Sequence, residues 1–130
     1  MNPQEARAVV RVWEEAVNAR DVERVLALSS PDIEIVGPRG SARGHAILTA
    51  WLDRAGLSLD TWRQFGRGGV IVNEQRGVWR DLESSAVVNE ADLDSHYRVE
   101  DGGRVVYVAL YDDLRTALAH ARLDETAALT

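Results

Sequence analysis

Three side chains in the second half of the chain have the chemistry and the spacing to act on a small molecule. Ser95 and Tyr97 alternate on one face of a predicted strand, and Asp112 follows the last predicted strand. A hydroxyl among apolar neighbours can orient a carbonyl or hydroxyl group of a ligand. A carboxylate beside an apolar cavity has its charged form disfavoured, which suits a general acid or base near neutral pH. We therefore take Asp112, Tyr97 and Ser95 as candidate catalytic residues, although Tyr97 also suits a core position and Asp112 a solvated one.

The same predicted strand presents two carboxylates and an imidazole on its other face. Asp92, Asp94 and His96 alternate there, and alternate strand residues can converge on a hard cation. Their spacing matches no established metal motif, and Arg98, next on the same face, would repel a cation. A strip of ion pairs facing solvent or a second subunit explains them better, so we predict no metal and no cofactor. A register slip of one residue would instead turn His96 inward as a proton-transfer group.

The composition excludes several classes of chemistry. The 130 residues include no cysteine, which excludes thiol nucleophiles, disulfides and cysteine-ligated metals. All 15 basic residues are arginine, so Schiff-base chemistry and a phosphate-binding P-loop lysine are excluded too. The formal net charge of −6 disfavours binding to nucleic acid or to an anionic membrane. The sequence shows no targeting signal and no apolar run of membrane-spanning length, so we expect a cytoplasmic protein.

Helical periodicity dominates the first part of the chain. Asn2 and Pro3 are typical of a helix start, and an apolar stripe at helical spacing follows them: Ala6, Val9, Val10, Trp13 and Val17. Asp21 suits the cap of a short second helix. Residues 45–55 predict a third helix, whose inward side chains are Ile47, Leu48, Trp51 and Leu52.

Strand patterns dominate the rest. Residues 33–36 predict a short strand, and residues 37–44 predict a loop, because three glycines and a proline disfavour regular structure there. Four longer strands are predicted at residues 57–65, 70–80, 86–99 and 104–111. Asp113 can cap a last helix, and residues 124–130 predict a loosely ordered tail after a single domain of residues 1–123. Helices followed by a meander of strands indicate an α+β fold with a curved antiparallel sheet over the helices.

The last predicted strand is apolar on both faces. Val106, Val108 and Leu110 alternate on one face, while aromatic side chains at Tyr107 and Tyr111 lie on the other. A strand that is apolar on both sides needs two partners, of which one is the core. We therefore predict a homodimer that packs through the outer sheet face at Tyr107 and Tyr111.

Three stretches of the sequence resemble the SnoaL-like proteins of the nuclear transport factor 2-like superfamily. They are residues 9–21 (VVRVWEEAVNARD), residues 43–45 before the third helix, and residues 103–106 leading into residues 110–113. The resemblance runs from about Gln4 to Leu123 and rests on the succession of these stretches. It implies a cone of curved sheet, closed by the helices around a deep and mostly apolar pocket.

The resemblance does not carry over the chemistry of the well-known relatives. Trp13 stands where ketosteroid isomerase has its oxyanion-hole tyrosine, and residues 35–37 (Ile-Val-Gly) stand where it has its general base. Ser95 stands near the position of its protonated aspartate. Leu110 stands where limonene epoxide hydrolase has an aspartate, and an aliphatic side chain cannot orient water. The familiar activities of the fold are therefore not expected here.

A pocket of this kind predicts a ligand that is small and hydrophobic or aromatic. The residues expected to line it are Trp13, Val36, Trp51, Trp62, Ser95, Tyr97, Val108 and Leu110. Binding without catalysis is the favoured function, because the usual bases are missing. The first alternative is an acid–base isomerase, dehydratase or polyketide-cyclase-like enzyme that uses Asp112, Tyr97 or Ser95. The second alternative is a dimeric assembly module whose cavity is filled by its own side chains.

Overall fold

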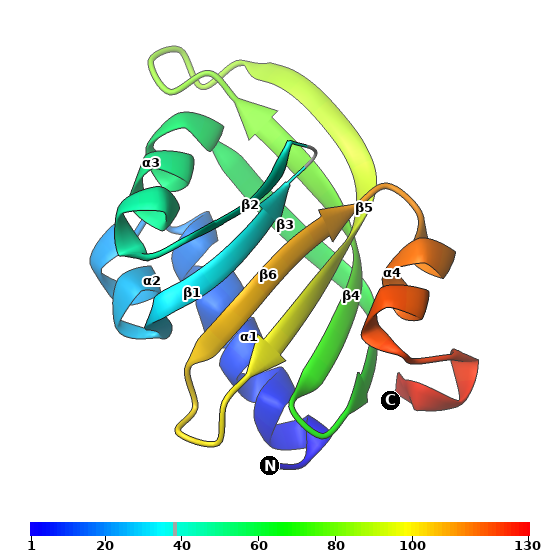
Figure 1. Ribbon diagram of the computed structural model, residues 1–130. Helices are drawn as coiled ribbons and strands as arrows, with labels where there is room; N and C mark the ends of the chain where they lie inside the picture. The colour runs from blue at the N-terminus through cyan, green and yellow to red at the C-terminus, as the bar shows by residue number, and fades with distance from the viewer. Residues whose placement is uncertain (38) are drawn as a thin grey trace.

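Four α-helices and seven strands make up the part of the chain that the structure, a computed structural model, describes: residues 1–37 and 39–130 (Figure 1). In chain order they are α1 (Pro3–Asn18), α2 (Val22–Ala27), β1 (Ser29–Gly37), β2 (Gly40–Arg43), α3 (His45–Ala55), β3 (Leu57–Arg67), β4 (Val70–Arg80), β5 (Val87–Val99), β6 (Val105–Tyr111), α4 (Leu114–Ala121) and β7 (Ala128–Leu129), with a short 3-10 helix at Glu125–Ala127.

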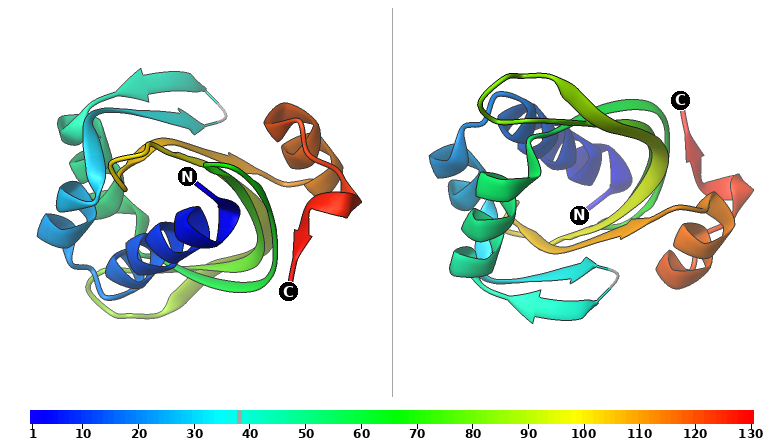
Figure 2. Two further views of the ribbon diagram at one scale, coloured as in Figure 1. Left: turned by 90° about the horizontal axis from the view of Figure 1, so that it is seen from below. Right: turned by 90° about the horizontal axis from the view of Figure 1, so that it is seen from above.

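All seven strands belong to one curved sheet, in the order β2-β1-β6-β5-β4-β3-β7. β1 and β6 run parallel, and every other neighbouring pair is antiparallel. The sheet curves around α1, while α2 and α3 close its open side and α4 lies against its convex face (Figure 2). This arrangement confirms the predicted α+β cone, in which the sheet wraps over the N-terminal helices.

Among the described helices, α1, α2 and α4 begin at the predicted capping residues, and α3 begins after Gly44. Asn2 Oδ1 accepts a hydrogen bond from the backbone N–H of Glu5 at 2.9 Å, and Asp21 and Asp113 cap α2 and α4 in the same way. These bonds satisfy N–H groups that no carbonyl within the helix can reach. α3 ends at Gly56, whose φ of 52° lies in the left-handed region that favours glycine. None of the described helices is both long enough and apolar enough to span a bilayer.

The segment predicted as a loop at residues 37–44 instead contributes a strand. β2 pairs antiparallel with β1, with Arg43 opposite Glu34, and the two side chains form an ion pair at 3.2 Å. Gly37 and Gly40 lie at the ends of β1 and β2 beside the turn, and Gly44 precedes α3. β2 is an edge strand, where only one side of the backbone must be paired, so these glycines do not prevent pairing. Pro38, part of the same prediction, lies outside the described residues.

The C-terminal segment covers part of the convex face of the sheet. Its apolar side chains pack with those of β3 and β4 in one cluster: Phe65, Val72, Ala117, Leu118, Ala121, Leu123 and Ala127. β7 pairs with β3, where Leu129 lies opposite Gln64. Residues 124–130 are therefore packed on the sheet, whereas the sequence predicted a loosely ordered tail. A two-residue strand is too short to show a hydrophobic period, so the pattern missed it.

The concave face holds the main core, around α1. Its fully or nearly buried apolar members include Ala6, Val10, Trp13, Val17, Ile33, Leu48, Ile71 and Tyr97. Val105 joins this core rather than Val106, because a bulge between β5 and β6 shifts the alternation by one residue. On α3, Ile47 was expected to point inward but is 40% exposed, since the helix buries its Leu48 side instead.

Candidate functional site

An apolar cavity of about 150 Å³ lies between α1, α3, β1 and β6, and we call it the inner hollow. Its wall consists of Trp13, Ile35, Val36, Gly37, Leu48, Trp51, Val108 and Leu110. Five of the residues that the sequence predicts for the pocket are thus brought together here: Trp13, Val36, Trp51, Val108 and Leu110. The indole N–H of Trp13 donates to Ser29 Oγ at 2.9 Å, so this polar group is already satisfied within the core.

Trp62 does not belong to this wall, contrary to the sequence prediction. Its side chain is 55% exposed and donates its indole N–H to Glu74 Oε1 at 3.1 Å. The strand register explains the error, because Thr61 lies opposite Gln75 while Arg63 lies opposite Glu74, which leaves Trp62 as the extra residue of a bulge. A bulge redirects a side chain, and alternation counted along the sequence cannot reveal it.

Ser95 and Tyr97 are buried on the concave side, but they belong to a polar network rather than to the inner hollow. The network is centred on Glu14, a residue of α1 that is 6% exposed, and we call it the Glu14 network. Its other members are Thr61, Asn73, Gln75, Ser95 and Tyr97.

Four side chains donate hydrogen bonds to the Glu14 carboxylate. Thr61 Oγ1 and Asn73 Nδ2 reach Oε1 at 3.0 and 3.1 Å. Gln75 Nε2 reaches Oε2 at 2.8 Å, and the Tyr97 hydroxyl donates to the same oxygen. Ser95 Oγ in turn donates to Gln75 Oε1. A buried carboxylate is tolerated only with such partners, so the strands must present donors wherever α1 presents Glu14.

The electrostatics of the network keep Tyr97 in its protonated form. Burial raises the pKa of Tyr97 well above its ordinary value, and the negative charge of Glu14 raises it further. Loss of its proton would place a phenolate beside a carboxylate in a buried site. Tyr97 and Ser95 are therefore committed as donors to Glu14 and Gln75, and neither hydroxyl is offered to a molecule in the inner hollow.

Glu14 is the main functional candidate that the sequence prediction missed. A signal was present, since Glu14 lies four residues after Val10 and three before Val17, within the apolar stripe of the first helix. A second signal was the pair Asn73 and Gln75, two amides at alternate positions of a predicted strand. When the apolar face of a helix and the core-facing side of a strand both contain polar side chains, a buried network between the helix and the strand is indicated.

A polar cleft of about 470 Å³ connects Glu14 to the surface between α1 and β3. Its walls are Gln4, Arg7, Ala8, Arg11, Glu14, Thr61, Gln64 and Thr130. Arg7 is held by a hydrogen bond to the backbone oxygen of Thr130 at 2.8 Å. The carboxylate at the end of this cleft is thus approached past two guanidinium groups, and not through the inner hollow.

Asp112 lines neither the inner hollow nor the polar cleft. Its side chain is exposed. The neighbouring Asp113 caps α4, accepting from the backbone N–H of Thr116 at 2.9 Å. The pocket-rim position expected for Asp112 is therefore not the one it occupies.

Asp92, Asp94 and His96 differ in burial, because α4 packs against β5. Asp92 is exposed and forms an ion pair with Arg76 at 3.0 Å. Asp94 and His96 are 6% and 4% exposed, and three of their polar atoms have no hydrogen-bond partner among the described residues. No group of three metal-ligating side chains is found in the described part of the chain.

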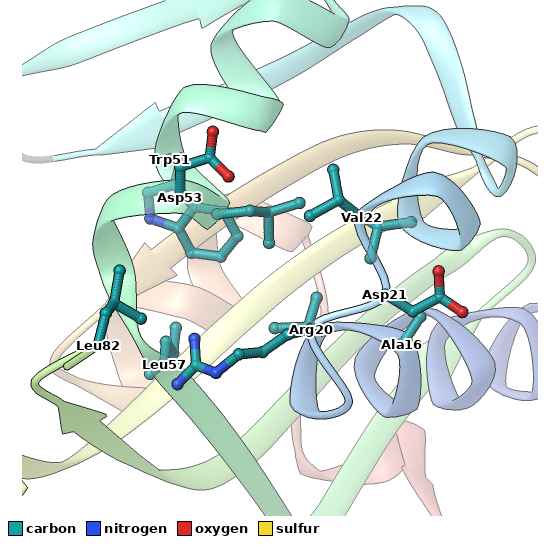
Figure 3. A pocket seen from close by; sticks show the side chains of 11 residues that line it. Ala16, Arg20, Asp21, Val22, Trp51, Asp53, Leu57 and Leu82 are labelled. Carbon is teal, nitrogen blue, oxygen red and sulfur yellow. The ribbon is translucent and has the colours of Figure 1, made fainter. Parts of the chain in front are cut away.

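A third cavity, of about 180 Å³, lies between α1, α2 and α3, and we call it the helix hollow (Figure 3). Its apolar wall includes Ala16, Val17, Val22, Val25, Trp51, Leu52, Leu57 and Leu82. Arg20, Asp21 and Asp53 complete it. Trp51 lines both this hollow and the inner hollow.

No protein-family model matches the sequence, and no curated protein matches it. Solved structures do match. A nuclear transport factor 2-like protein from Burkholderia xenovorans LB400 is 26% identical, with 93% of this chain and 98% of that chain covered at a TM-score of 0.68. A candidate polyketide cyclase from Xanthomonas campestris pv. campestris is 22% identical, with 93% and 99% covered at a TM-score of 0.70.

A third similar structure contains a ligand. It is a Mycobacterium tuberculosis protein in complex with estradiol-17β-hemisuccinate, 19% identical, with 88% of this chain and 97% of that chain covered at a TM-score of 0.73. Each comparison covers at least 88% of this chain and at least 97% of the other chain, so the similarity extends over the whole fold. The chain therefore has the nuclear transport factor 2-like fold, as the resemblance in its sequence implied.

Proposed function

We propose that this protein binds a small apolar or aromatic molecule, about the size of one ring, in the inner hollow without transforming it. The observation that carries the proposal is the wall of the hollow. Within the described residues it includes no charged side chain and no hydroxyl, and its volume is about 150 Å³. An apolar cavity of roughly this size, ~150 Å³, stays dry and takes up benzene.

The positions of the candidate catalytic groups support binding over turnover. Ser95 and Tyr97 donate to partners inside the Glu14 network, and Asp112 is exposed. A general acid or base must lie within hydrogen-bonding distance of the reacting atom. None of the three lines the inner hollow. The hollow also argues against the assembly module with a filled cavity, since its side chains leave space for a ligand.

The size of the hollow limits the ligand. The similar protein from Mycobacterium tuberculosis holds a steroid derivative. Pockets for ligands of that size measure about 300–1,000 Å³. At about 150 Å³, the inner hollow of this chain suits a single ring such as toluene or indole. Burying about 150 Å² of such a ligand contributes about 4 kcal/mol, which corresponds to a Kd on the order of 1 mM.

Two substitutions in the wall test this function. Val36→Phe should fill the hollow and abolish toluene binding, whereas Leu110→Ala should enlarge it and allow a two-ring ligand such as naphthalene. Val87→Phe is the matched control, because Val87 is 46% exposed on β5 and lines no hollow described here. Ligand-observed NMR gives the readout. Toluene binding that is equal in wild type and Val36→Phe would overturn the proposal.

The polar cleft favours a second candidate function, acid–base chemistry at Glu14. The carboxylate lines a cleft of about 470 Å³, together with Arg7 and Arg11. A substrate there would be a polar or anionic molecule. The four donors that hold the carboxylate argue for a structural role, which is why we rank this candidate second. Isothermal titration with small carboxylates and phosphates distinguishes the two, since binding lost in Arg11→Gln but retained in Val36→Phe would favour the cleft.

A further inference from the structure

The helix hollow offers a different kind of site from the inner hollow. Its body is apolar, with Val17, Val22 and Leu57 among its walls, and its volume of about 180 Å³ also suits one ring or a short hydrocarbon chain. Unlike the inner hollow, it includes three charged side chains, Arg20, Asp21 and Asp53. A cavity with an apolar body and few charged groups selects ligands by the charge of their polar end.

Arg20 is the charged group best placed to meet a ligand. Figure 3 shows its side chain extended toward Leu57 and Leu82, across the hollow. In the part of the chain that the structure describes, its guanidinium group takes part in no ion pair or hydrogen bond. A guanidinium group at the edge of an apolar cavity matches a carboxylate, which can accept two hydrogen bonds from it.

The backbone sets the direction in which the side chain of Arg20, an exposed residue, leaves the chain. Its φ of 57° lies in the left-handed region, at the turn that ends α1. The Arg20 N–H donates to the carbonyl of Val17 at 3.0 Å, and the Asp21 N–H donates to the carbonyl of Ala16 at 2.9 Å. These bonds close the end of the helix and fix the direction in which the arginine side chain leaves the chain.

The two acidic side chains are directed elsewhere. Asp21 accepts a hydrogen bond from the backbone N–H of Arg24 at 3.2 Å, as the cap of α2. In Figure 3 the carboxylates of Asp21 and Asp53 point away from the space between Trp51 and Arg20. Their charges weaken the attraction for an anion at longer range, but they do not occupy the position beside the guanidinium group.

We propose that the helix hollow binds an aromatic or aliphatic carboxylic acid, with the hydrocarbon part between α1, α2 and α3 and the carboxylate on Arg20. This site is separate from the one-ring site of the inner hollow and is expected to bind whether or not that hollow is occupied. The ligand class follows from the combination of an apolar cavity with a single cation across it.

Three probes of nearly equal shape test the charge preference: phenylacetate, phenylacetamide and 2-phenylethylamine. We expect the wild-type protein to bind phenylacetate most tightly, by about tenfold over the amide, as the loss of one charge-assisted contact requires. Arg20→Gln should abolish this preference and leave amide binding unchanged. Arg24→Gln removes the same charge from an exposed neighbour that does not line the hollow, and it should change neither affinity by more than about twofold.

The outcomes separate this proposal from the binding function of the inner hollow. NMR chemical-shift titration measures each affinity, and toluene binding to the same samples reports on the inner hollow. Phenylacetate that binds no better than its amide, or equally well to wild type and Arg20→Gln, overturns the proposal even where toluene binds. Tighter binding of 2-phenylethylamine also overturns it, since Asp21 or Asp53 would then dominate. Val36→Phe should leave phenylacetate binding intact.

Discussion

Asp94 and His96 should make the free energy of unfolding depend on pH in opposite directions, and the two effects should cancel in the wild type. Both side chains lie on the convex face under α4, nearly buried and with polar atoms lacking partners among the described residues. Burial raises the pKa of Asp94 from 3.8 to about 6, and the negative charges of Glu74, Asp113 and Asp92 add to this effect. Burial lowers the pKa of His96 from 6.5 to about 4, and the positive charges of Arg98 and His120 add to it.

Whether stability rises or falls with pH depends on whether the folded or the unfolded chain binds the proton. Between about pH 4 and 6 the folded protein holds a proton on Asp94, while the unfolded chain holds one on the histidine. The raised pKa of Asp94 makes the free energy of unfolding fall as pH rises from 3.8 to about 6. The lowered pKa of His96 makes it rise as pH increases from about 4 to 6.5. After allowance for partial solvent screening, each effect is about 1 to 3 kcal/mol.

Single substitutions should reveal the two effects. Relative to wild type, Asp94→Asn should become more stable by about 1 to 3 kcal/mol as the pH rises from about 4 to 6. His96→Gln should become less stable by a similar amount over its own range, and the double variant should parallel the wild type. Urea unfolding followed by tryptophan fluorescence at about pH 4, 5, 6 and 7 gives these values. Equal slopes for the wild type and Asp94→Asn would show that Asp94 is solvated and would refute the reasoning.

Three further predictions concern the Glu14 network, the end of α3 and the oligomeric state. Glu14→Gln removes the charge and turns an amide donor toward two of the four existing donors, and it should lower the free energy of unfolding by about 2 to 4 kcal/mol in urea titrations, whereas a change below about 0.5 kcal/mol would mean that the cleft solvates this carboxylate. Gly56→Ala places a Cβ against the backbone oxygen of Arg80 at a positive φ, and its thermal midpoint should fall by several degrees, more than that of Gly102→Ala, which has no backbone atom within 3.4 Å of the added carbon. The homodimer predicted from the outer face stays a prediction: Tyr111 stacks on His120 of α4 with ring centroids 5.2 Å apart, Tyr107 packs against His96 and Arg98, and Tyr107→Glu should sediment as a monomer if this face is the interface. A wild-type monomer at micromolar concentration would remove the dimer.

The order of the elements could be predicted because it depends on local signals. The caps at Asn2, Asp21 and Asp113 and the stop at Gly56 act within one helical turn of their positions, so composition at those sites suffices. β2 and β7 could not be predicted in the same way. β2 pairs with β1 across a turn, and β7 pairs with β3, which is far away in the sequence. Both strands are too short for their residues to show an alternating hydrophobic pattern.

The sequence placed the site residues correctly on strands in which side chains alternate regularly between the two faces, and it misplaced them where a bulge interrupts the alternation. Val108 and Leu110 alternate undisturbed on β6 and reach the inner hollow as expected. Trp62 sits at a bulge and is turned outward. Glu14 was missed for a different reason, since a charged residue on an apolar stripe is normally assigned to the surface. Its burial becomes favourable through contacts with donors on distant strands, Asn73 and Gln75 among them.

Trp13 explains how one concave face can hold both a polar network and an apolar hollow. Its ring meets that of Tyr97 edge-on, with centroids 5.5 Å apart and planes inclined by 70°, and it also lines the inner hollow. Because its N–H is used by Ser29, it presents carbon to both sides. The carboxylate of Glu14 is thereby kept among its donors, and a molecule in the inner hollow meets only apolar atoms on this side. Trp13 therefore separates the polar network from the inner hollow, which agrees with the proposed binding of an apolar molecule there.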